Sequence, residues 1–207
     1  MTTSTPPREN PTHGYGQGEA LQDGLGIDLI SGQMIAAIII FGSNIEHYLE
    51  AAIWQLRGQP IPERPDTDKR ISDRMSLFDA EVAKVEDDDK RRLLEAWSEA
   101  FRSGLIIRNN IVHGVTLRFP WGQTSFMRNP QWDGVKRKQE FGMFTLDIST
   151  LTMVRDAFAV MLRVIHKVSN GSADLMEDRM VKRAVNEARS ILGEFADHTY
   201  GPHYEKY

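Results

Sequence analysis

The seven residues from 108 to 114, Arg-Asn-Asn-Ile-Val-His-Gly, combine side chains suited to acid–base and phosphate chemistry. Histidine exchanges a proton near neutral pH, and the planar guanidinium of arginine matches two phosphate oxygens. An apolar stripe recurs upstream at three- and four-residue spacing: Leu94, Trp97, Phe101 and Leu105. This spacing predicts a core-facing helix. The stripe continues to Arg108 and Val112, so we expect the Arg108 charge to meet a carboxylate or other acceptors.

His113 is expected at the end of this helix. Asn109 and His113 are four residues apart and therefore share one helix face. Gly114 is the residue type that ends helices in the left-handed conformation. Arg108 and His113 are five apart, which corresponds to about 140° around a regular helix. Within one chain these two side chains do not converge if the helix is regular to its end, and a symmetric pair of chains would help.

The segment resembles the R-N-x-x-x-H signature of the HEPN superfamily, small helical domains of which many are metal-independent ribonucleases. The resemblance rests on Arg108, Asn109 and His113, followed by Gly114, and on a helical layout over roughly residues 28 to 196. It implies a homodimer whose two motif helices meet in one composite cleft. His113 would be the general acid or base, Arg108 would stabilise the phosphorane, and Asn109 would orient either the nucleotide or His113 through its amide.

Two supporting residues and one structural alternative accompany this hypothesis. The resemblance places the first long helix against the motif helix, which makes Glu46 the expected partner of Arg108; Asn110 is a second supporting residue. In the alternative, Arg108 only pairs with Glu46 or with backbone carbonyls, and His113 only caps its helix. The protein would then be a non-catalytic HEPN-like module that dimerises or binds a nucleotide or another partner.

The resemblance to HEPN toxins and defence effectors also implies the partners. RNA would be the substrate, and a separate antitoxin or other regulatory protein would be a partner. Lys136, Arg137 and Lys138, with Arg128 nearby, could hold an RNA backbone. A charged loop between two strands is, however, ordinarily only a solvated surface.

Composition excludes several other classes. The chain has 207 residues, of which 41% are hydrophobic and 26% charged, as expected for one domain. It has no cysteine, so disulfides and thiolate metal sites are excluded, and a cytoplasmic location is expected. We expect no metal or other cofactor. The net charge of −4 argues against a broad nucleic-acid-coating surface. The apolar run from Met34 to Phe41 is too short to span a bilayer, so no membrane is expected.

The remaining pattern predicts a mainly α fold of four to five helices, and the resemblance implies that they form an HEPN-like bundle. Polar tails are expected over residues 1–24 and 198–207, around a single domain of residues 25–197. Helices are predicted over 31–57 and 71–85, from the acidic run at 86–89 to His113, from Asp147 or Ser149 to Asn170, and after a cap at Ser172. Residues 115–147 are predicted as a small antiparallel β insert with strands 115–119 and 141–146. The first helix has a wide apolar face, which indicates core plus interface.

Overall fold

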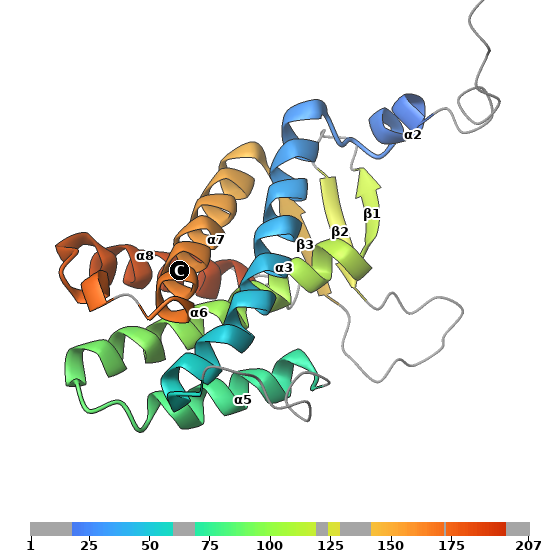
Figure 1. Cartoon of the computed structure of the whole chain (residues 1–207). Helices are drawn as coiled ribbons and strands as arrows, with labels where there is room; N and C mark the ends of the chain where they lie inside the picture. Colours follow the sequence, from blue (N-terminus) through green and yellow to red (C-terminus); the bar gives the residue numbers. More distant parts are fainter. Residues whose placement is uncertain (1–17, 60–68, 119–123, 129–141, 172, 198–207) are drawn as a thin grey trace, which may run out of the picture.

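A computed structural model describes residues 18–59, 69–118, 124–128, 142–171 and 173–197. Over these residues the chain is mainly helical, with a small antiparallel β insert after the fourth helix (Figure 1). The helices are α2 (Gly18–Gly24), α3 (Leu29–Arg57), α5 (Ile71–Val82), α6 (Asp88–His113), α7 (Ile148–Ser169) and α8 (Arg179–Asp197). The strands are β1 (Val115–Arg118), β2 (Thr124–Arg128) and β3 (Gly142–Leu146).

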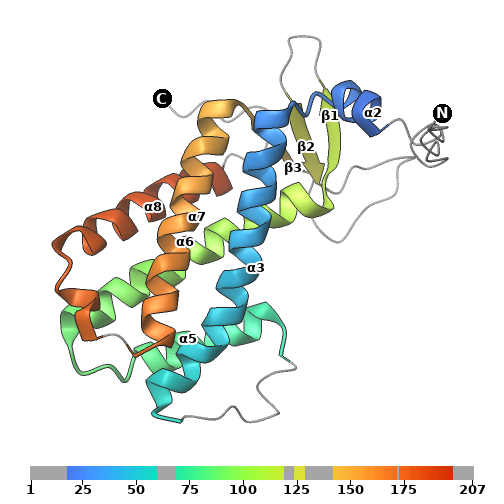
Figure 2. The same cartoon turned by 45° about the horizontal axis from the view of Figure 1, so that its top comes forward.

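Helix α3 runs through the middle of the molecule beside α7 (Figures 1 and 2). Asp28 caps its start by accepting a hydrogen bond from the backbone N–H of Ser31 at 2.7 Å, and Gly58 ends it in the left-handed conformation, with φ 67°. Met34 contacts Thr152 near the start of α7, and the Tyr48 ring lies 4.7 Å from that of His166 near its end. The two helices therefore run in the same direction.

The centre of the core lies where α3, α6 and α7 meet. The buried ring of Phe158 on α7 fits against two helix glycines, because a Cβ atom would be 3.5 Å from it at Gly42 and 3.1 Å at Gly104. Trp97 on α6 is also buried, and its indole N–H donates to the carbonyl oxygen of Met161 at 2.9 Å. The contacts of Phe158 with the two glycines join α7 to α3 and α6. The hydrogen bond of the Trp97 indole further joins α6 to α7.

The β insert has one more strand than the sequence pattern predicts. The order is β1-β2-β3, and both neighbouring pairs are antiparallel, with Val115 opposite Met127 and Thr124 opposite Leu146. The predicted outer strands are present as β1 and β3. The segment of β2 was not predicted as a strand, because its five residues show no run of β-branched or aromatic residues. Its place is stabilised by pairing on both sides and by burial of Phe126.

Both ends of the domain differ from the prediction. Residues Gly18–Gly24, assigned above to the polar tail, form helix α2, in which no residue is buried. The last helix begins at Arg179, where Asp178 accepts a hydrogen bond from the N–H of Met180 at 2.9 Å. Ser172, the predicted cap, lies outside the described residues. A 3-10 turn, η2 (Ala173–Met176), precedes α8 and places Leu175 in the core.

Helix α3 is long and apolar enough, by length and composition alone, to cross a membrane. The helix is longer than the apolar run from Met34 to Phe41 considered above. A mostly buried core helix passes the same test, but only 17% of the most apolar 18-residue window of α3 is buried. In this fold one face of α3 belongs to the core, since Ile38, Ile45 and Leu49 are fully buried. The apolar residues on that face therefore pack within the chain.

Candidate functional site

Helix α6 carries the predicted site at its C-terminal end. Asp87 caps its start by accepting hydrogen bonds from the N–H groups of Asp89 and Lys90, at 2.9 and 3.0 Å. The α-helix extends to His113. Arg108 and His113 are therefore about 140° apart around the helix axis. Because the helix is regular to its end, these two side chains of one chain point in different directions, as expected from their spacing.

Gly114 follows the helix in a different conformation from the one predicted. Its φ of −78° and ψ of 154° are extended, so it is not a left-handed cap. Its N–H still bonds to the carbonyl oxygen of Asn110 at 2.9 Å. A Cβ atom at this position would overlap that oxygen and would lie 3.2 Å from the carbonyl oxygen of Met127 on β2. Glycine is needed here because the helix end and β2 crowd the backbone.

The buried face of α6 turns away from Arg108 toward the end of the helix. Leu94, Trp97 and Phe101 are buried as predicted. The continuation to Val112 is wrong, because this side chain is 41% exposed. The buried residues near the end are instead Gly104, Ile107, Asn110 and Ile111. A straight helix drifts relative to a seven-residue repeat, and the last turns pack against α8 and β2. Arg108 therefore lies at the edge of the core.

The Arg108 guanidinium has more donors than its surroundings use. Its Nη1 donates to the amide oxygen of Asn109 at 3.0 Å, and its Nη2 lies 3.8 Å from the carboxylate of Glu46 on α3. Its Nε is buried and has no hydrogen-bond partner among the described residues. The side chain is 21% exposed. The group is thus held in place. Because Nε is shielded from solvent, an anion would bind through the N–H groups of Nη1 and Nη2 that these contacts leave unused.

Arg74 on α5 is a neighbour of this site that the sequence pattern did not indicate. Its Nη1 lies 3.5 Å from the backbone oxygen of Glu46 and 3.7 Å from the carboxylate of Glu50. Two guanidinium groups therefore approach the same stretch of α3. Arg74 lies between Ile71 and Met75 in an ordinary amphipathic pattern, so only the packing of α5 against α3 reveals it.

The other two motif residues are exposed and differ in their contacts. Asn109 and His113 lie one turn apart on the outer face of α6. Asn109 is occupied by Arg108, whereas the imidazole of His113 has no hydrogen-bond partner among the described residues. His113 is also in the last turn, where a positive imidazolium interacts favourably with the helix dipole. It is accessible to a substrate or to a second chain.

Asn110, the second supporting residue, is buried rather than open to a substrate. Its side chain is 1% exposed, and neither its amide oxygen nor its amide nitrogen has a hydrogen-bond partner within the described residues. A buried amide without partners costs about 1–3 kcal/mol. Asn110 therefore does not belong to the exposed cluster of Arg108, Asn109 and His113.

The predicted basic cluster cannot be located. Lys136, Arg137 and Lys138 lie outside the described residues. Arg128 ends β2, and its side chain is likewise outside the described part. Among the described residues, no three His, Asp or Glu side chains are grouped so that they could hold a metal ion.

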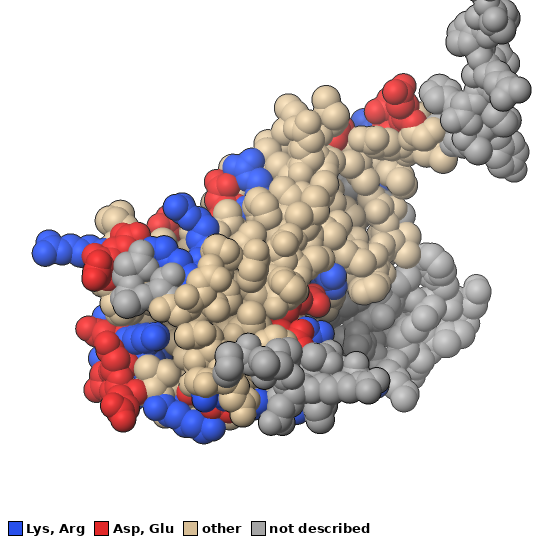
Figure 3. Space-filling model, in the orientation of Figure 1, with Lys and Arg blue, Asp and Glu red and all other residues tan. Residues whose placement is uncertain are grey.

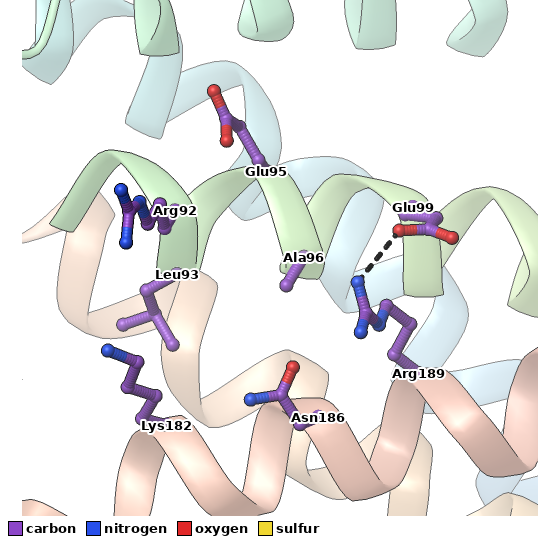
Figure 4. A pocket seen from close by; sticks show the side chains of 8 residues that line it. All are labelled: Arg92, Leu93, Glu95, Ala96, Glu99, Lys182, Asn186 and Arg189. Atoms are coloured by element: carbon purple, nitrogen blue, oxygen red, sulfur yellow. Dashed lines mark hydrogen bonds and ion pairs between the residues drawn. The ribbon is translucent and has the colours of Figure 1, made fainter. Parts of the chain in front are cut away.

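A groove of about 340 Å³ lies between α6 and α8, away from the motif (Figure 4). It is lined by the first half of α6 and by polar residues of α8. Two of its cations form ion pairs, Arg189 with Glu99 at 3.1 Å and Lys182 with Asp89 at 3.0 Å. Both cations that α8 contributes to the groove are thus paired with α6, so the end of α6 is the better candidate site.

No protein-family model, curated protein or solved structure matches this chain.

Proposed function

We propose that the protein is a metal-independent endoribonuclease of the HEPN toxin or defence type, acting as a cytoplasmic homodimer with a composite active site. His113 is the general acid or base, Arg108 stabilises the charge of the phosphorane, and Asn109 positions Arg108. An antitoxin or other regulatory protein would be a separate chain. The motif resemblance at these three residues is the starting point, and the geometry of α6 supports it.

The chemistry requires few groups. The 2′-hydroxyl of one nucleotide loses a proton and attacks the adjacent phosphorus, and the 5′-oxygen of the next nucleotide leaves as it gains a proton. An imidazole is suited to both proton transfers near neutral pH, with a contribution of typically 10²–10⁴-fold. A guanidinium is suited to the negative charge that grows on the phosphorus oxygens.

The observation that carries the proposal is the spare hydrogen-bonding capacity of Arg108 at the same helix end as an exposed His113. Asn109 accepts one N–H of Nη1, and Glu46 lies 3.8 Å from Nη2, so further N–H groups of these two nitrogens remain for a phosphate. Because Arg108 and His113 diverge around α6, one chain does not present both to a single phosphate. A second copy of the motif supplies the missing group.

The alternative is a non-catalytic helical module. It is favoured by one specific contact, the approach of Glu46 to Arg108 at 3.8 Å, which a purely structural arginine would also make. In that case the exposed His113 serves dimerisation or binding of a nucleotide or protein.

The test is cleavage of several RNAs by the purified chain in the presence of a chelator. We expect cleavage by the wild type and a loss of about 10²-fold or more with His113→Ala. His166→Ala is the matched control, because His166 is also an exposed helix histidine, on α7. Both variants should keep the wild-type unfolding temperature. Growth arrest on expression should likewise be relieved by His113→Ala alone.

Two results would contradict the proposal. Cleavage that persists with His113→Ala would remove this residue from the chemistry. A folded, dimeric wild type that cleaves none of the RNAs would favour the non-catalytic module.

A further inference from the structure

The outward face of the first half of α3 carries no charge. From Leu29 to Ile45 the helix contains no Asp, Glu, Lys or Arg, and Figure 3 shows an uncharged surface over this part of α3. Leu29 is 72% exposed and Ile40 56%. Ile148, at the start of the neighbouring α7, is a further exposed apolar residue. An uncharged surface with several exposed large apolar residues indicates a contact site.

The exposed residues of this face follow a regular spacing. They recur at alternating steps of four and three residues: Leu29, Gln33, Ala36, Ile40, Ser43 and His47. We call these six residues the α3 stripe. Steps of four and three place side chains along one line of a helix, which is the arrangement by which two helices pack side by side. The small Ala36 near the middle allows close approach.

The polar residues at the lower end of the α3 stripe are compatible with burial. The hydroxyl of Ser43 donates to the carbonyl oxygen of Ile39 at 3.0 Å. The side-chain amide of the adjacent Asn44 donates to the carbonyl oxygen of Ile40 at 2.8 Å. Because the hydroxyl proton of Ser43 and one N–H of Asn44 are already used within α3, covering these two donors would not leave them unsatisfied.

We infer that the α3 stripe is the surface by which two copies of this chain associate. A two-fold contact brings the same patch of both copies together, and an uncharged patch meets no like charge in its mate. The stripe also ends beside the motif, since Glu46, which precedes His47, is the carboxylate near Arg108. The inference deepens the proposed function and rests on it for the need of a second motif at this end of α6.

A lipid surface is the less suitable occupant. Residues 18–56 contain no Lys or Arg, while Glu19, Asp23 and Asp28 lie at the start of the stripe. Helices that lie on membranes carry Lys and Arg on their polar face, because these residues attract anionic lipids. The acidic end of α3 would be repelled by such lipids. A second protein chain with the same uncharged stripe meets no such repulsion.

The test is the oligomeric state of the full chain by analytical ultracentrifugation over a concentration series. We expect a wild-type dimer that Ile40→Glu weakens by about 100-fold or more, because one unpaired carboxylate from each copy would be buried. Met180→Glu is the matched control: Met180 is a similarly exposed apolar residue, on α8, and its substitution should leave the dimer unchanged. Unfolding temperatures establish that both variants are folded.

A second measurement does not depend on the folding of Ile40→Glu. The chain has no cysteine, so Ile40→Cys introduces a single thiol. A short bifunctional thiol reagent should give a covalent dimer with Ile40→Cys and none with Met180→Cys.

The outcomes separate this inference from the proposed function. A monomeric wild type, or a dimer that Ile40→Glu and the cross-linker leave unaffected, overturns the inference. A monomeric wild type that binds anionic vesicles through Ile40 also overturns it and identifies lipid as the occupant. A dimer that Ile40→Glu dissociates, in a protein without RNA cleavage, supports the interface and contradicts the ribonuclease.

Discussion

Arg108 is held by few contacts for a partly buried arginine. Asn109 accepts one hydrogen bond from it, and Glu46 approaches it only to 3.8 Å. Its aliphatic stem passes close to Gly42, where a Cβ atom would be 3.6 Å from Arg108 Cγ. A larger residue at position 42 would displace this stem. The orientation of the guanidinium is therefore set mainly by packing and by Asn109.

Glu46→Gln is predicted to strengthen RNA binding. The substitution removes the carboxylate that competes with phosphate for Arg108, and we expect the free energy of unfolding to fall by less than about 1 kcal/mol. RNA affinity is measured by fluorescence anisotropy in a His113→Ala background, which prevents cleavage, and stability by urea denaturation. A loss of several kcal/mol, with no gain in RNA affinity, would instead identify the pair as a structural ion pair.

Asn110→Leu is predicted to stabilise the fold. The amide of Asn110 is buried and has no hydrogen-bond partner among the described residues, so an apolar side chain of similar volume removes a desolvation cost of about 1–3 kcal/mol. We expect the free energy of unfolding to rise by about 1 kcal/mol. Asn109→Leu, at the exposed neighbouring position, is the control and should change stability by only about 0.5 kcal/mol or less. Destabilisation by Asn110→Leu would show that the amide has a partner in solution.

At the scale of the elements, the site depends on where α6 begins and ends. The helix begins where Asp87 caps its first N–H groups. It ends just before Gly114, where β2 lies close to the backbone. The same helix is fixed against α7 by the fit of Phe158 to Gly104. These contacts bring the end of α6 to the middle of α3, where Glu46 lies.

The start of α7 provides a test of a helix cap. The backbone N–H of Thr150 and the hydroxyl of Ser149 bond to Asp147 and lower the pKa of its carboxyl below the ordinary value of 3.8. A lowered pKa contributes stability above pH 3.8 that is lost as the pH falls through the folded-state value. We expect Asp147→Ala to cost about 1 kcal/mol at pH 7. The difference from the wild type should shrink below pH 3.8.

Urea denaturation at a series of pH values measures this effect. Glu187→Ala, which removes an exposed carboxylate on α8, is the control and should change stability at pH 7 by only about 0.5 kcal/mol or less. A cost of Asp147→Ala that stays constant down to pH 2 would show that the carboxylate does not supply the cap.

At the scale of the whole molecule, one chain presents Arg108 and His113 in different directions. Glu46 on α3 lies near Arg108, and Arg74 on α5 contacts the backbone of Glu46. His113 projects from α6 in a different direction from Arg108. The geometry of a single chain therefore separates the two groups to which we assign charge stabilisation and proton transfer. The proposed site is complete only with a second chain.

Mixing two inactive variants tests this requirement. Arg108→Ala and His113→Ala should each lose RNA cleavage alone. When the two are unfolded and refolded together, roughly half of the dimers contain one chain of each kind and retain one Arg108 and one His113 from different chains. We expect cleavage to return in the mixture. Each variant refolded alone is the control, and a mixture as inactive as its components would contradict a composite site.

Local patterns in the sequence were sufficient for most helices, because caps and apolar spacing act within a few residues. Asp28, Asp87 and Asp147 each precede a helix and each cap it, and Gly58 ends α3. The motif residues could be placed at the end of α6 for the same reason. Strand β2 was missed because its sequence signal is weak and pairing on both sides stabilises it. Helix α2 was missed because it has only seven residues and buries none of them.

The sequence by itself determined which side chains gather at the end of α6, since their spacing on one regular helix fixes their relative directions. Only the tertiary structure decided that Arg74 on α5 contacts the backbone of Glu46, that Asn110 is buried, and that Gly114 is extended beside β2. Those outcomes depend on contacts between residues far apart along the chain. Neither helical spacing nor residue type specifies such contacts, because several packings of the same helices bury the same apolar faces.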